Sequence, residues 1–530
     1  MKYEREETAI KKTILHGAVY ILIFTVVSRV IGFIYRIYLS NVIGPEGMGI
    51  YQIVFAVFGV LITLTSSGIP VTVSRQSAIY FQNRNSDSAE RTVTAAAIIG
   101  LVTSGVISLG ILLFQHQLRW VFADSRCMPI FLCLIPAFIF SSIYSACRGG
   151  LWGEKNFFLY SFTEFIEEIL LVVLGVILLQ FADGIFSGAF YASLAVCISY
   201  CVAAVVTFVV YVRRRKFFQV PKGFIKPLLK SSMPLTGIRL CSNILNSLIA
   251  IIIPARLCLT GMSTSEALSA FGIMSGMTLP LLFLPDTFVS SVALLLVPEL
   301  SADHANRDPA FLKKTEFAIS FAVAVALMCM PAFIACGPGI GQFLYQNDVA
   351  GMYLRQCAFV MIFMCLSLIT NTIMNSMGLE YKTMKNFLVG AASLLLCIWF
   401  LPKYIGIYAL MVGYCANLFL NAVLNLFTIR KHAKISLKFL LPLIGYAAVL
   451  VPAGFLSYYV YNIASAFLPL AVAVLGSCAF SFGMCAALAF LFKFISFEKL
   501  GVKLPEFRKK KKKEKCPSKK GVGRFKTLKS

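Results

Sequence analysis

Long apolar runs separated by short polar breaks extend along almost the whole of this 530-residue chain. Apolar runs of 18 or more residues are typical of helices that cross a bilayer, whereas the strands of a membrane barrel alternate apolar and polar positions. We therefore expect an all-α integral membrane protein. The pattern predicts about 14 spans, with approximate limits at residues 14–43, 47–73, 92–114, 128–147, 157–181, 184–212, 229–258, 268–298, 313–336, 351–377, 383–401, 405–430, 437–461 and 466–494.

The Lys and Arg residues predict how these spans are oriented. With an even number of spans, both termini and every second loop lie on the same side of the membrane. That side holds 40 of the 48 Lys and Arg residues. Loops rich in Lys and Arg are retained in the cytoplasm. We therefore expect a multi-pass protein of the bacterial plasma membrane with both termini in the cytoplasm.

Six spans precede the largest internal polar loop and six follow it, before a last pair. The predicted organisation is a cytoplasmic N-tail, an N-lobe of spans 1–6, a basic linker, a C-lobe of spans 7–12, spans 13 and 14, and a basic tail. Their limits are residues 1–13, 14–212, 213–228, 229–430, 437–494 and 495–530.

Short similarities link the two lobes. The second span ends in "SGIPVTVSR" (67–75), and the eighth ends in "LLLVPELS" (294–301). The fourth span leads into "GEKNF" (153–157), and the tenth leads into "YKTMKNF" (381–387). Because six is even, corresponding spans point the same way, which predicts a parallel pseudo-repeat. Two such lobes usually enclose a central cavity, and rocking them gives alternating access.

No Walker A, H-E-x-x-H or G-x-S-x-G motif occurs, so nothing in the sequence argues for an enzyme. The chain is 59% hydrophobic and 13% charged, with a mean hydropathy of +0.83. The 16 Cys are scattered through apolar runs and are interpreted as small membrane-core residues, and the four His lack metal-site spacing. The glycine cluster "GPGIG" (337–341) predicts a turn between two spans rather than a phosphate loop. We expect neither a metal nor a cofactor.

The stretch from Lys499 to Ser530 carries 14 basic and 2 acidic residues. Basic patches bind nucleic acid in some proteins, but directly after a membrane span we favour anionic lipid headgroups as the partner. A solvated tail without any specific partner is an equal alternative.

Several charged residues fall at membrane depth, where they cost a few kcal/mol or more unless they face a protein interior or a water-filled cavity. They are Arg29 and Arg36 in the first span, Glu164, Glu167 and Glu168 in the fifth, Arg239 and Arg256 in the seventh, and Asp286 in the eighth.

The functional interpretation is that Arg29, Arg36 and Arg239 make a cavity that binds an anion, because the planar guanidinium suits phosphate. Glu164, Glu167 and Glu168 would exchange a proton or bind a cation.

Each charge also has a structural alternative. Arg36 and Arg256 could snorkel toward the membrane surface, and Arg29 could form a buried pair with Glu167. Asp286 could bond the backbone amides freed by Pro285.

Several motifs resemble the stage V sporulation protein B family of polysaccharide-biosynthesis transporters. That family belongs to the multidrug/oligosaccharidyl-lipid/polysaccharide (MOP) flippase superfamily. The motifs are "SRVIGF" (28–33), "GPEGMGIYQ" (44–52), "SGIPVTVSR" (67–75), "CRGGLWGEKNF" (147–157) and the stretch from Pro254 to Pro285. The resemblance spans nearly all of residues 10–495.

The resemblance implies 14 helices and kinship with MurJ-type flippases, which move lipid II across the membrane. Arg29 matches the arginine that MurJ-type proteins need for function. Tyr35 and Arg36 stand where that type has an Arg-Asp pair, so the saccharide carried stays open.

The expected function is to flip an undecaprenyl-diphosphate-linked precursor of peptidoglycan or spore cortex, with coupling to H⁺, Na⁺ or membrane potential. The alternatives are a cation-coupled multidrug exporter and a non-transporting scaffold that recruits cell-wall synthesis proteins.

Overall fold

The computed structural model describes residues 2–119, 122, 124–221, 223–433, 435 and 441–491, and these residues form helices joined by short turns, with no strand among them. The helices are α1 (Lys2–Ile62), η1 (Thr63–Ser67), α2 (Ile69–Gln82), α3 (Ser86–Leu113), α4 (Gln115–Leu118), α5 (Cys127–Cys133), α6 (Ile135–Gly153), α7 (Phe157–Leu179), α8 (Ile185–Val212), α9 (Ile225–Cys258), α10 (Thr264–Phe271), η3 (Gly272–Thr278), α11 (Leu279–Leu282), α12 (Leu284–Ala305), α13 (Ala310–Tyr345), α14 (Asp348–Cys357), α15 (Val360–Ser376), α16 (Glu380–Phe400), α17 (Pro402–Ile405), α18 (Tyr408–Ala433), α19 (Leu441–Phe467) and α20 (Leu470–Leu491).

The all-helical membrane architecture predicted from the sequence is confirmed, whereas the predicted count of 14 spans is not. Within the described residues, 10 helices are long and apolar enough to cross a membrane, or 12 if each of two bent pairs is one span. Two features account for the difference from 14. The first two predicted spans fall in α1, η1 and α2, which count as one continuous candidate span (Ile23–Gln82) although α1 is broken at Gly44 (φ 70°). The fifth coincides with α7, which carries three glutamates.

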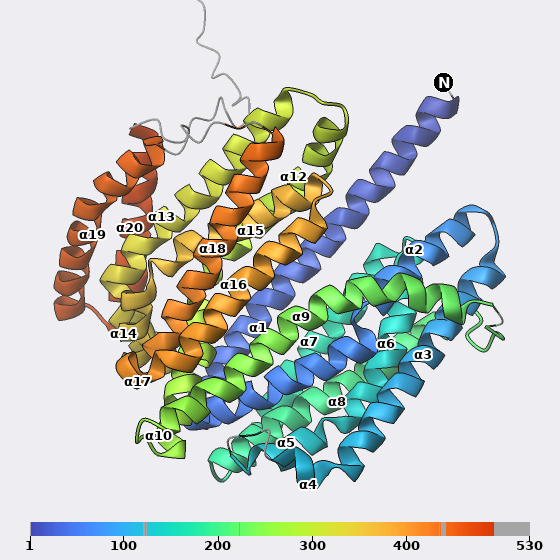
Figure 1. The fold of residues 1–530 in the computed structure, drawn as a ribbon, viewed down its shortest axis with the longest axis horizontal. Helices are drawn as coiled ribbons and strands as arrows, with labels where there is room; N and C mark the ends of the chain where they lie inside the picture. The colour runs from blue at the N-terminus through green and yellow to red at the C-terminus, as the bar shows by residue number, and fades with distance from the viewer. Residues whose placement is uncertain are drawn as a thin grey trace, which may run out of the picture.

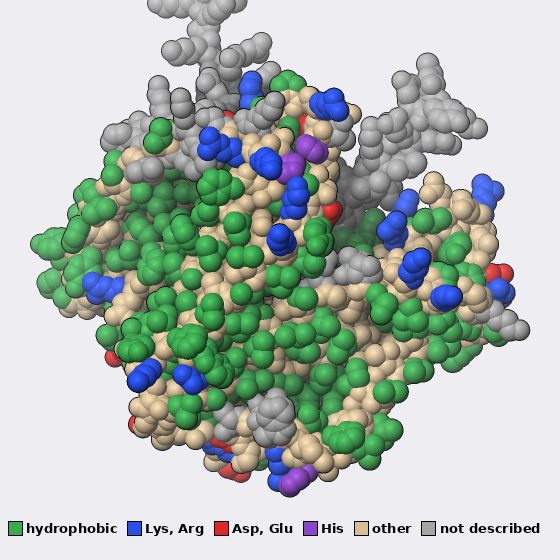
Figure 2. Space-filling view, viewed as in Figure 1, with side chains coloured by type: hydrophobic (Ala, Val, Ile, Leu, Met, Phe, Trp, Pro, Cys, Tyr) green, Lys and Arg blue, Asp and Glu red, His purple; other side chains and the backbone are tan. Residues whose placement is uncertain are grey.

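The helices form two groups, shown in Figure 1. One group holds α2–α8, the other holds α12–α18, and α19 and α20 pack together against α13. Figure 2 shows apolar side chains covering the flanks of both groups, while Lys and Arg gather mainly at one end. We call this end, where α2–α3, α6–α7 and α12–α13 are joined, the basic end.

Irregular segments occur in the same pairs of predicted spans in the two groups, although the two π-helical segments lie at opposite ends of their spans. The π-helical segment η1 follows the second arm of α1, and η3 follows α10, so the second and eighth predicted spans both contain one. The fourth predicted span is divided between α5 and α6, and the tenth is bent by 61° between α14 and α15. Both breaks lie away from the basic end.

The groups meet tightly at the end opposite the basic end. There the turn of α1 packs on α10 and η3 through glycines, with no room for side chains. A Cβ added to Gly272 would lie 2.6 Å from the backbone nitrogen of Gly49. A Cβ added to Gly276 would lie 2.5 Å from Cγ of Met48. We call this contact the glycine seam. It closes the space between the groups at this end.

Helix α9 connects the two groups along its length. Its N-terminal half packs on η1, α2 and α3, whereas its C-terminal half packs on α10, α16 and α17. In its middle, the amide of Asn243 donates to the carbonyl of Gly59 (3.3 Å) and to the hydroxyl of Thr63 (2.5 Å). The first half of α9 therefore forms a wall of the N-terminal group.

A buried amide cluster ties α15, α16 and α18 together. The Asn425 amide group donates to Asn371 (2.7 Å) and Asn421 (2.9 Å), and its carbonyl oxygen accepts from Asn386 (2.9 Å). Apolar side chains pack about equally well against lipid and against another helix, so apolar contacts alone hold membrane helices together weakly. Hydrogen bonds between helices add to this, because lipid offers no competing hydrogen bonds.

Candidate functional site

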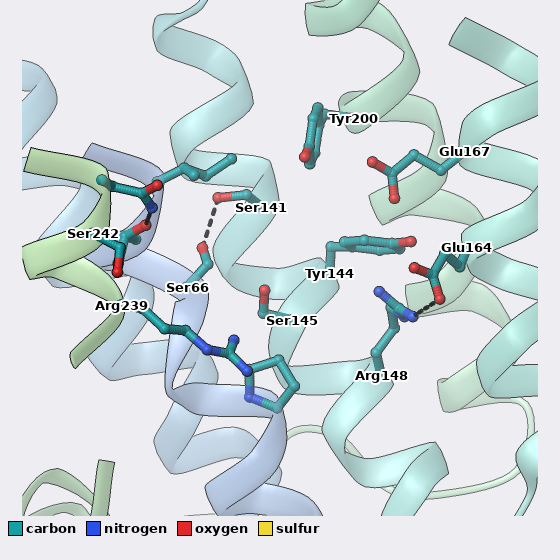
Figure 3. Close-up of a pocket in the computed structure, with 14 residues that line it drawn as sticks. Ser66, Ser141, Tyr144, Ser145, Arg148, Glu164, Glu167, Tyr200, Arg239 and Ser242 are labelled. Atoms are coloured by element: carbon teal, nitrogen blue, oxygen red, sulfur yellow. Dashed lines mark hydrogen bonds and ion pairs between the residues drawn. The ribbon is translucent and has the colours of Figure 1, made fainter. Parts of the chain in front are cut away.

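A polar cavity of about 570 Å³ lies in the N-terminal group, toward the basic end (Figure 3). Its walls are contributed by η1 and adjacent residues of α1 and α2, by α6, α7 and α8, and by α9. The lining residues are Ile62, Thr63, Ser66, Pro70, Ser141, Tyr144, Ser145, Arg148, Glu164, Glu167, Tyr200, Arg239, Ser242 and Asn243. A cavity with four charged side chains inside an apolar helix bundle is a candidate site for a polar solute.

Helix α6 supplies one wall as a polar stripe. Ser141, Ser145 and Arg148 recur at i, i+4 and i+7 and therefore lie on one face, with Tyr144 beside them. At the far end of this stripe, Ser141 and Ser66 share a hydrogen bond of 2.8 Å between their hydroxyls. This bond joins α6 to η1 and fixes the floor of the cavity.

The guanidinium of Arg148 is held by aromatic and acidic neighbours. It lies 4.4 Å from the ring centre of Tyr160 and 5.1 Å from that of Tyr144. Its Nη2 donates to Oε2 of Glu164 at 2.7 Å. The Arg148 side chain is only 13% exposed, whereas that of Glu164 is 47% exposed. Packing against the two rings thus fixes the Arg148 side chain, and the Glu164 carboxylate contacts it from the more exposed side of the cavity.

Glu167 lies one turn deeper on α7 and faces a different set of partners. The hydroxyls of Tyr144 and Tyr200 lie near its carboxylate, and Arg148 is within electrostatic range. Glu164 and Glu167 are thus both neighbours of Arg148 from a single helix. Counted from Phe157 at 1.5 Å per residue, Glu164 lies about 10 Å and Glu167 about 15 Å along α7.

Arg239 faces Arg148 from the α9 wall, and its side chain is exposed (Figure 3). Ser242 and Asn243, one turn further along α9, also line the cavity. Both Arg148 and Arg239 lie within electrostatic range of the Tyr160 hydroxyl. The cavity therefore presents two guanidinium groups, one from α6 and one from α9.

Of the eight residues predicted from sequence, Glu164, Glu167 and Arg239 line this cavity. Arg29 is exposed on the first arm of α1 and has no ion pair with Glu167. Arg36 is half-buried near the hydroxyls of Tyr51 and Tyr345.

The other three predicted residues also lie outside the cavity lining. A Cβ on Gly32 would meet the carboxylate of Glu168, so Glu168 faces the first arm of α1. The guanidinium of Arg256 lies 4.9 Å from the ring centre of Trp399, at the end of α9 opposite the basic end. Asp286, in the first turn of α12, lies near the Cys365 thiol.

Sequence reasoning missed Arg148, which was counted as a loop residue because a charged position ended the apolar run. It belongs to α6. The polar stripe Ser141, Ser145 and Arg148 in an otherwise apolar helix was the available signal. No group of three or more potential metal ligands was found among the described residues.

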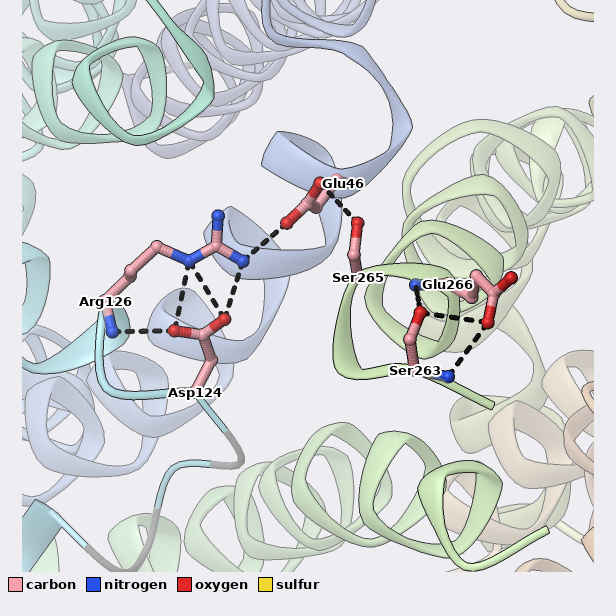
Figure 4. Close-up of polar contacts among 6 residues, drawn as sticks. All are labelled: Glu46, Asp124, Arg126, Ser263, Ser265 and Glu266. Carbon is pink, nitrogen blue, oxygen red and sulfur yellow. Dashed lines mark hydrogen bonds and ion pairs between the residues drawn. The ribbon is translucent and has the colours of Figure 1, made fainter. Parts of the chain in front are cut away.

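A second polar cluster lies at the opposite end, beside the glycine seam (Figure 4). Arg126 donates to Glu46 at 2.5 Å and to Asp124 at 2.7 Å, while the Ser265 hydroxyl of α10 donates to Glu46 at 2.6 Å. Burial alone would raise the pKa of Asp124, but hydrogen bonds from Arg126 outweigh it and hold that pKa below its usual value. This cluster links the two groups where the seam closes them.

The sequence profile of the polysaccharide biosynthesis protein family matches residues 14–302, more than half of the chain. The chain belongs to this family. It is 23% identical over 473 residues to stage V sporulation protein B of Bacillus subtilis (strain 168), covering 84% of this chain and 89% of the relative. It is 22% identical over 463 residues to the uncharacterised membrane protein YabM of the same organism, with 84% and 85% coverage. The family resemblance seen in the sequence is therefore confirmed.

Solved structures give the fold of this family member. It superposes on the lipid II flippase MurJ in an inward closed conformation with a TM-score of 0.70, at 12% identity, over 90% of this chain and 99% of that one. It superposes on an inward-facing multidrug resistance MATE transporter of the MOP superfamily with a TM-score of 0.64, at 15% identity, over 76% and 93%. The fold is that of membrane transporters rather than of enzymes.

Proposed function

We propose that this family member is a flippase for an undecaprenyl-diphosphate-linked saccharide, a precursor of peptidoglycan or spore cortex. The observation that carries the proposal is the cavity in which Arg148 and Arg239 face each other among serine and tyrosine hydroxyls. Guanidinium groups bind phosphate oxygens through paired N–H donors, and hydroxyls suit a sugar. The similarity to stage V sporulation protein B and the fold of MurJ support the same class of cargo.

The physical problem is a headgroup too polar for hydrocarbon, attached to a tail that cannot leave it. In the proposed mechanism the diphosphate enters from the basic end and lies between Arg148 and Arg239, while the polyprenyl chain stays in lipid. Opening of the glycine seam and closure of the basic end then expose the headgroup on the other side.

Roles for the remaining predicted residues follow from their positions. Arg29 and Arg36, on the first arm of α1, would guide the anion along that arm. Glu164, Glu167 and Glu168 on α7 would couple the cycle to H⁺, Na⁺ or membrane potential, because carboxylates at this depth respond to the charge of the cargo. Arg256 and Asp286 lie outside the cavity lining and receive no cargo contact in this mechanism.

We further propose that the basic end and both termini are cytoplasmic, following the bias of Lys and Arg. The basic tail lies outside the described residues. Its proposed partners are anionic membrane lipids, with cell-wall synthesis proteins as a further class.

The test is transport of a fluorescent lipid-linked disaccharide diphosphate in proteoliposomes, followed by quenching from outside. Arg239→Gln should slow translocation at least tenfold. Arg213→Gln is the matched control, because Arg213 is exposed in the linker after α8, and it should leave the rate unchanged. Equal rates in wild type and Arg239→Gln would refute the cargo assignment.

A cation-coupled multidrug exporter is the second candidate, favoured by Glu167 between the hydroxyls of Tyr144 and Tyr200, an acidic and aromatic corner suited to a cation. This candidate predicts that expression protects a drug-sensitive host against lipophilic cations and that Glu167→Gln removes the protection. A flippase predicts no protection from either form.

A non-transporting scaffold is the third alternative. It predicts that deleting residues 499–530 removes function in cells, whereas a flippase keeps most of its transport without them.

A further inference from the structure

We propose that Glu164 is a resident counter-ion that occupies Arg148 in the empty cavity and is displaced from it by the diphosphate of the cargo. The inference rests on the proposed function and concerns one step of it, namely how an anion binds to an arginine that already has a partner. It assigns Arg148 as a cargo-binding residue and Glu164 as the residue that sets the affinity.

The first argument is the charge balance of the cavity. Its charged lining residues are Arg148, Arg239, Glu164 and Glu167, so the formal charges cancel. A diphosphate joined to a lipid and a sugar keeps ionised oxygens on both phosphorus atoms. Adding it without rearrangement would bring anions together at low dielectric, which is unfavourable. A carboxylate must therefore move away as the cargo enters.

The second argument identifies which carboxylate moves. Glu167 is less exposed than Glu164 and lies beside the hydroxyls of Tyr144 and Tyr200, which leaves it less room to turn away. Glu164 has one hydrogen bond, to Arg148, and its side chain is 47% exposed. An exposed carboxylate with a single partner can turn into water at little cost, because water replaces the bond that it loses.

The third argument is that Arg148 stays in place when Glu164 leaves. The rings of Tyr144 and Tyr160 lie 5.1 and 4.4 Å from its guanidinium carbon and are independent of Glu164. Its Nε is buried without a hydrogen-bond partner among the described residues. The guanidinium therefore keeps its position and has donors for phosphate oxygens once the carboxylate has gone.

The exchange has a consequence for the cycle. Because Glu164 competes for the same guanidinium, it weakens cargo binding, and it also returns to Arg148 when the cargo leaves. Removing the carboxylate should therefore tighten binding while slowing turnover. A residue with a purely structural role would not separate these two quantities.

The test measures binding of farnesyl diphosphate to the full chain in nanodiscs by thermophoresis, with farnesol as the uncharged control. Glu164→Gln should bind farnesyl diphosphate about fivefold more tightly, the amount expected for removing a partly exposed ion pair. Arg148→Gln should lose most of the binding, and adding Glu164→Gln to it should change nothing further.

The matched control is Glu154→Gln, which removes a carboxylate paired with Arg214 and Arg215 at the basic end, outside the cavity lining. It should bind farnesyl diphosphate as the wild type does. Unfolding temperatures of all variants show whether each is folded. In proteoliposomes, Glu164→Gln should flip the labelled disaccharide lipid more slowly than the wild type.

The outcomes separate the two proposals. Equal affinity in wild type and Glu164→Gln, or a gain that persists without Arg148, overturns the exchange and leaves the flippase proposal standing. Tighter binding in Glu164→Gln with no translocation by the wild type supports the exchange and refutes the flippase. If neither the wild type nor Glu164→Gln prefers farnesyl diphosphate over farnesol, both proposals fail.

Discussion

Replacing Gly272 by alanine should push the two helix groups apart at the end opposite the basic end. The added Cβ would lie 2.6 Å from the nitrogen of Gly49, and the carbonyl oxygen of Pro45 is closer still. Ordinary contact begins near 3.4 Å, so the two backbones must separate by at least about 0.8 Å. Neither neighbour can yield by changing a rotamer, because both are backbone atoms.

The steric clash raises the free energy only of the state in which the glycine seam is closed. Inserting one methyl group into a tight contact costs about 1–3 kcal/mol. A free-energy change of that size shifts a two-state equilibrium about 5- to 150-fold. Gly272→Ala should therefore populate the seam-open state at the expense of the arrangement seen here.

Hydrogen exchange followed by mass spectrometry measures this directly, without thiol probes that the 16 native cysteines would complicate. Peptides covering residues 45–49 and 268–276 should exchange faster in Gly272→Ala. Gly105→Ala is the control, because a Cβ at Gly105 in α3 meets nothing within 4 Å. Unchanged exchange at the seam in a folded Gly272→Ala protein, or an equal rise throughout the chain, would refute the reasoning.

Three further predictions concern the first arm of α1, the amide cluster and the tail. Arg29→Ala should lower the rate of disaccharide-lipid translocation at least tenfold while leaving the unfolding temperature unchanged; an unaltered rate would remove Arg29 from the anion path. Asn425→Ala should destabilise the protein by about 2 kcal/mol, from three interhelical hydrogen bonds (to Thr370 and Asn371 of α15 and from Asn386 of α16) at about 0.6 kcal/mol each, measured by thermal unfolding in detergent; a change below a few tenths of a kcal/mol would show that the cluster contributes little. Deletion of residues 499–530 should retain most translocation in proteoliposomes but reduce binding to vesicles containing anionic lipid, and loss of transport itself would contradict a lipid-binding role.

The positions of the helices could be predicted because lipid imposes a simple rule on the sequence. Most of the predicted spans coincide with a helix or a bent pair, since a membrane segment must be long, apolar and helical. The second span instead runs through α1, η1 and α2, and the fourth is divided between α5 and α6. What hydropathy could not show is whether the chain stays helical through a polar break. Helix α13 extends to Tyr345, nine residues beyond the predicted limit of span nine, whereas α1 breaks at Gly44, within the predicted gap between the first two spans.

The predicted turn at residues 337–341 is wrong, and the reason is physical. These glycines lie inside α13, where Gly337 and Gly341 let the backbone of α14 approach at Gly351. A Cβ on Gly337 would lie 2.9 Å from the carbonyl oxygen of Gly351. Glycine permits a turn and a close helix contact equally, and the sequence alone does not distinguish them.

The candidate site could be predicted in part. Its acidic side was visible because three glutamates in one apolar helix are rare. Their partners were not, because each comes from another helix. Glu164 pairs with Arg148 of α6, Glu167 with tyrosines of α6 and α8, and Glu168 faces the first arm of α1. Neighbours along a helix follow from spacing, whereas neighbours across helices depend on the fold.

Helix α9 is anchored to one group by its first half and to the other by its second half, with Asn243 holding its middle against Gly59 and Thr63. No rigid rotation of one group against the other can satisfy all three attachments at once. The helix must flex, or the bonds of Asn243 must break and re-form, each time the molecule changes state. The resistance of α9 to bending therefore opposes each change of state. An α9 that bends more easily would lower the barrier between the two states without altering any residue of the cavity.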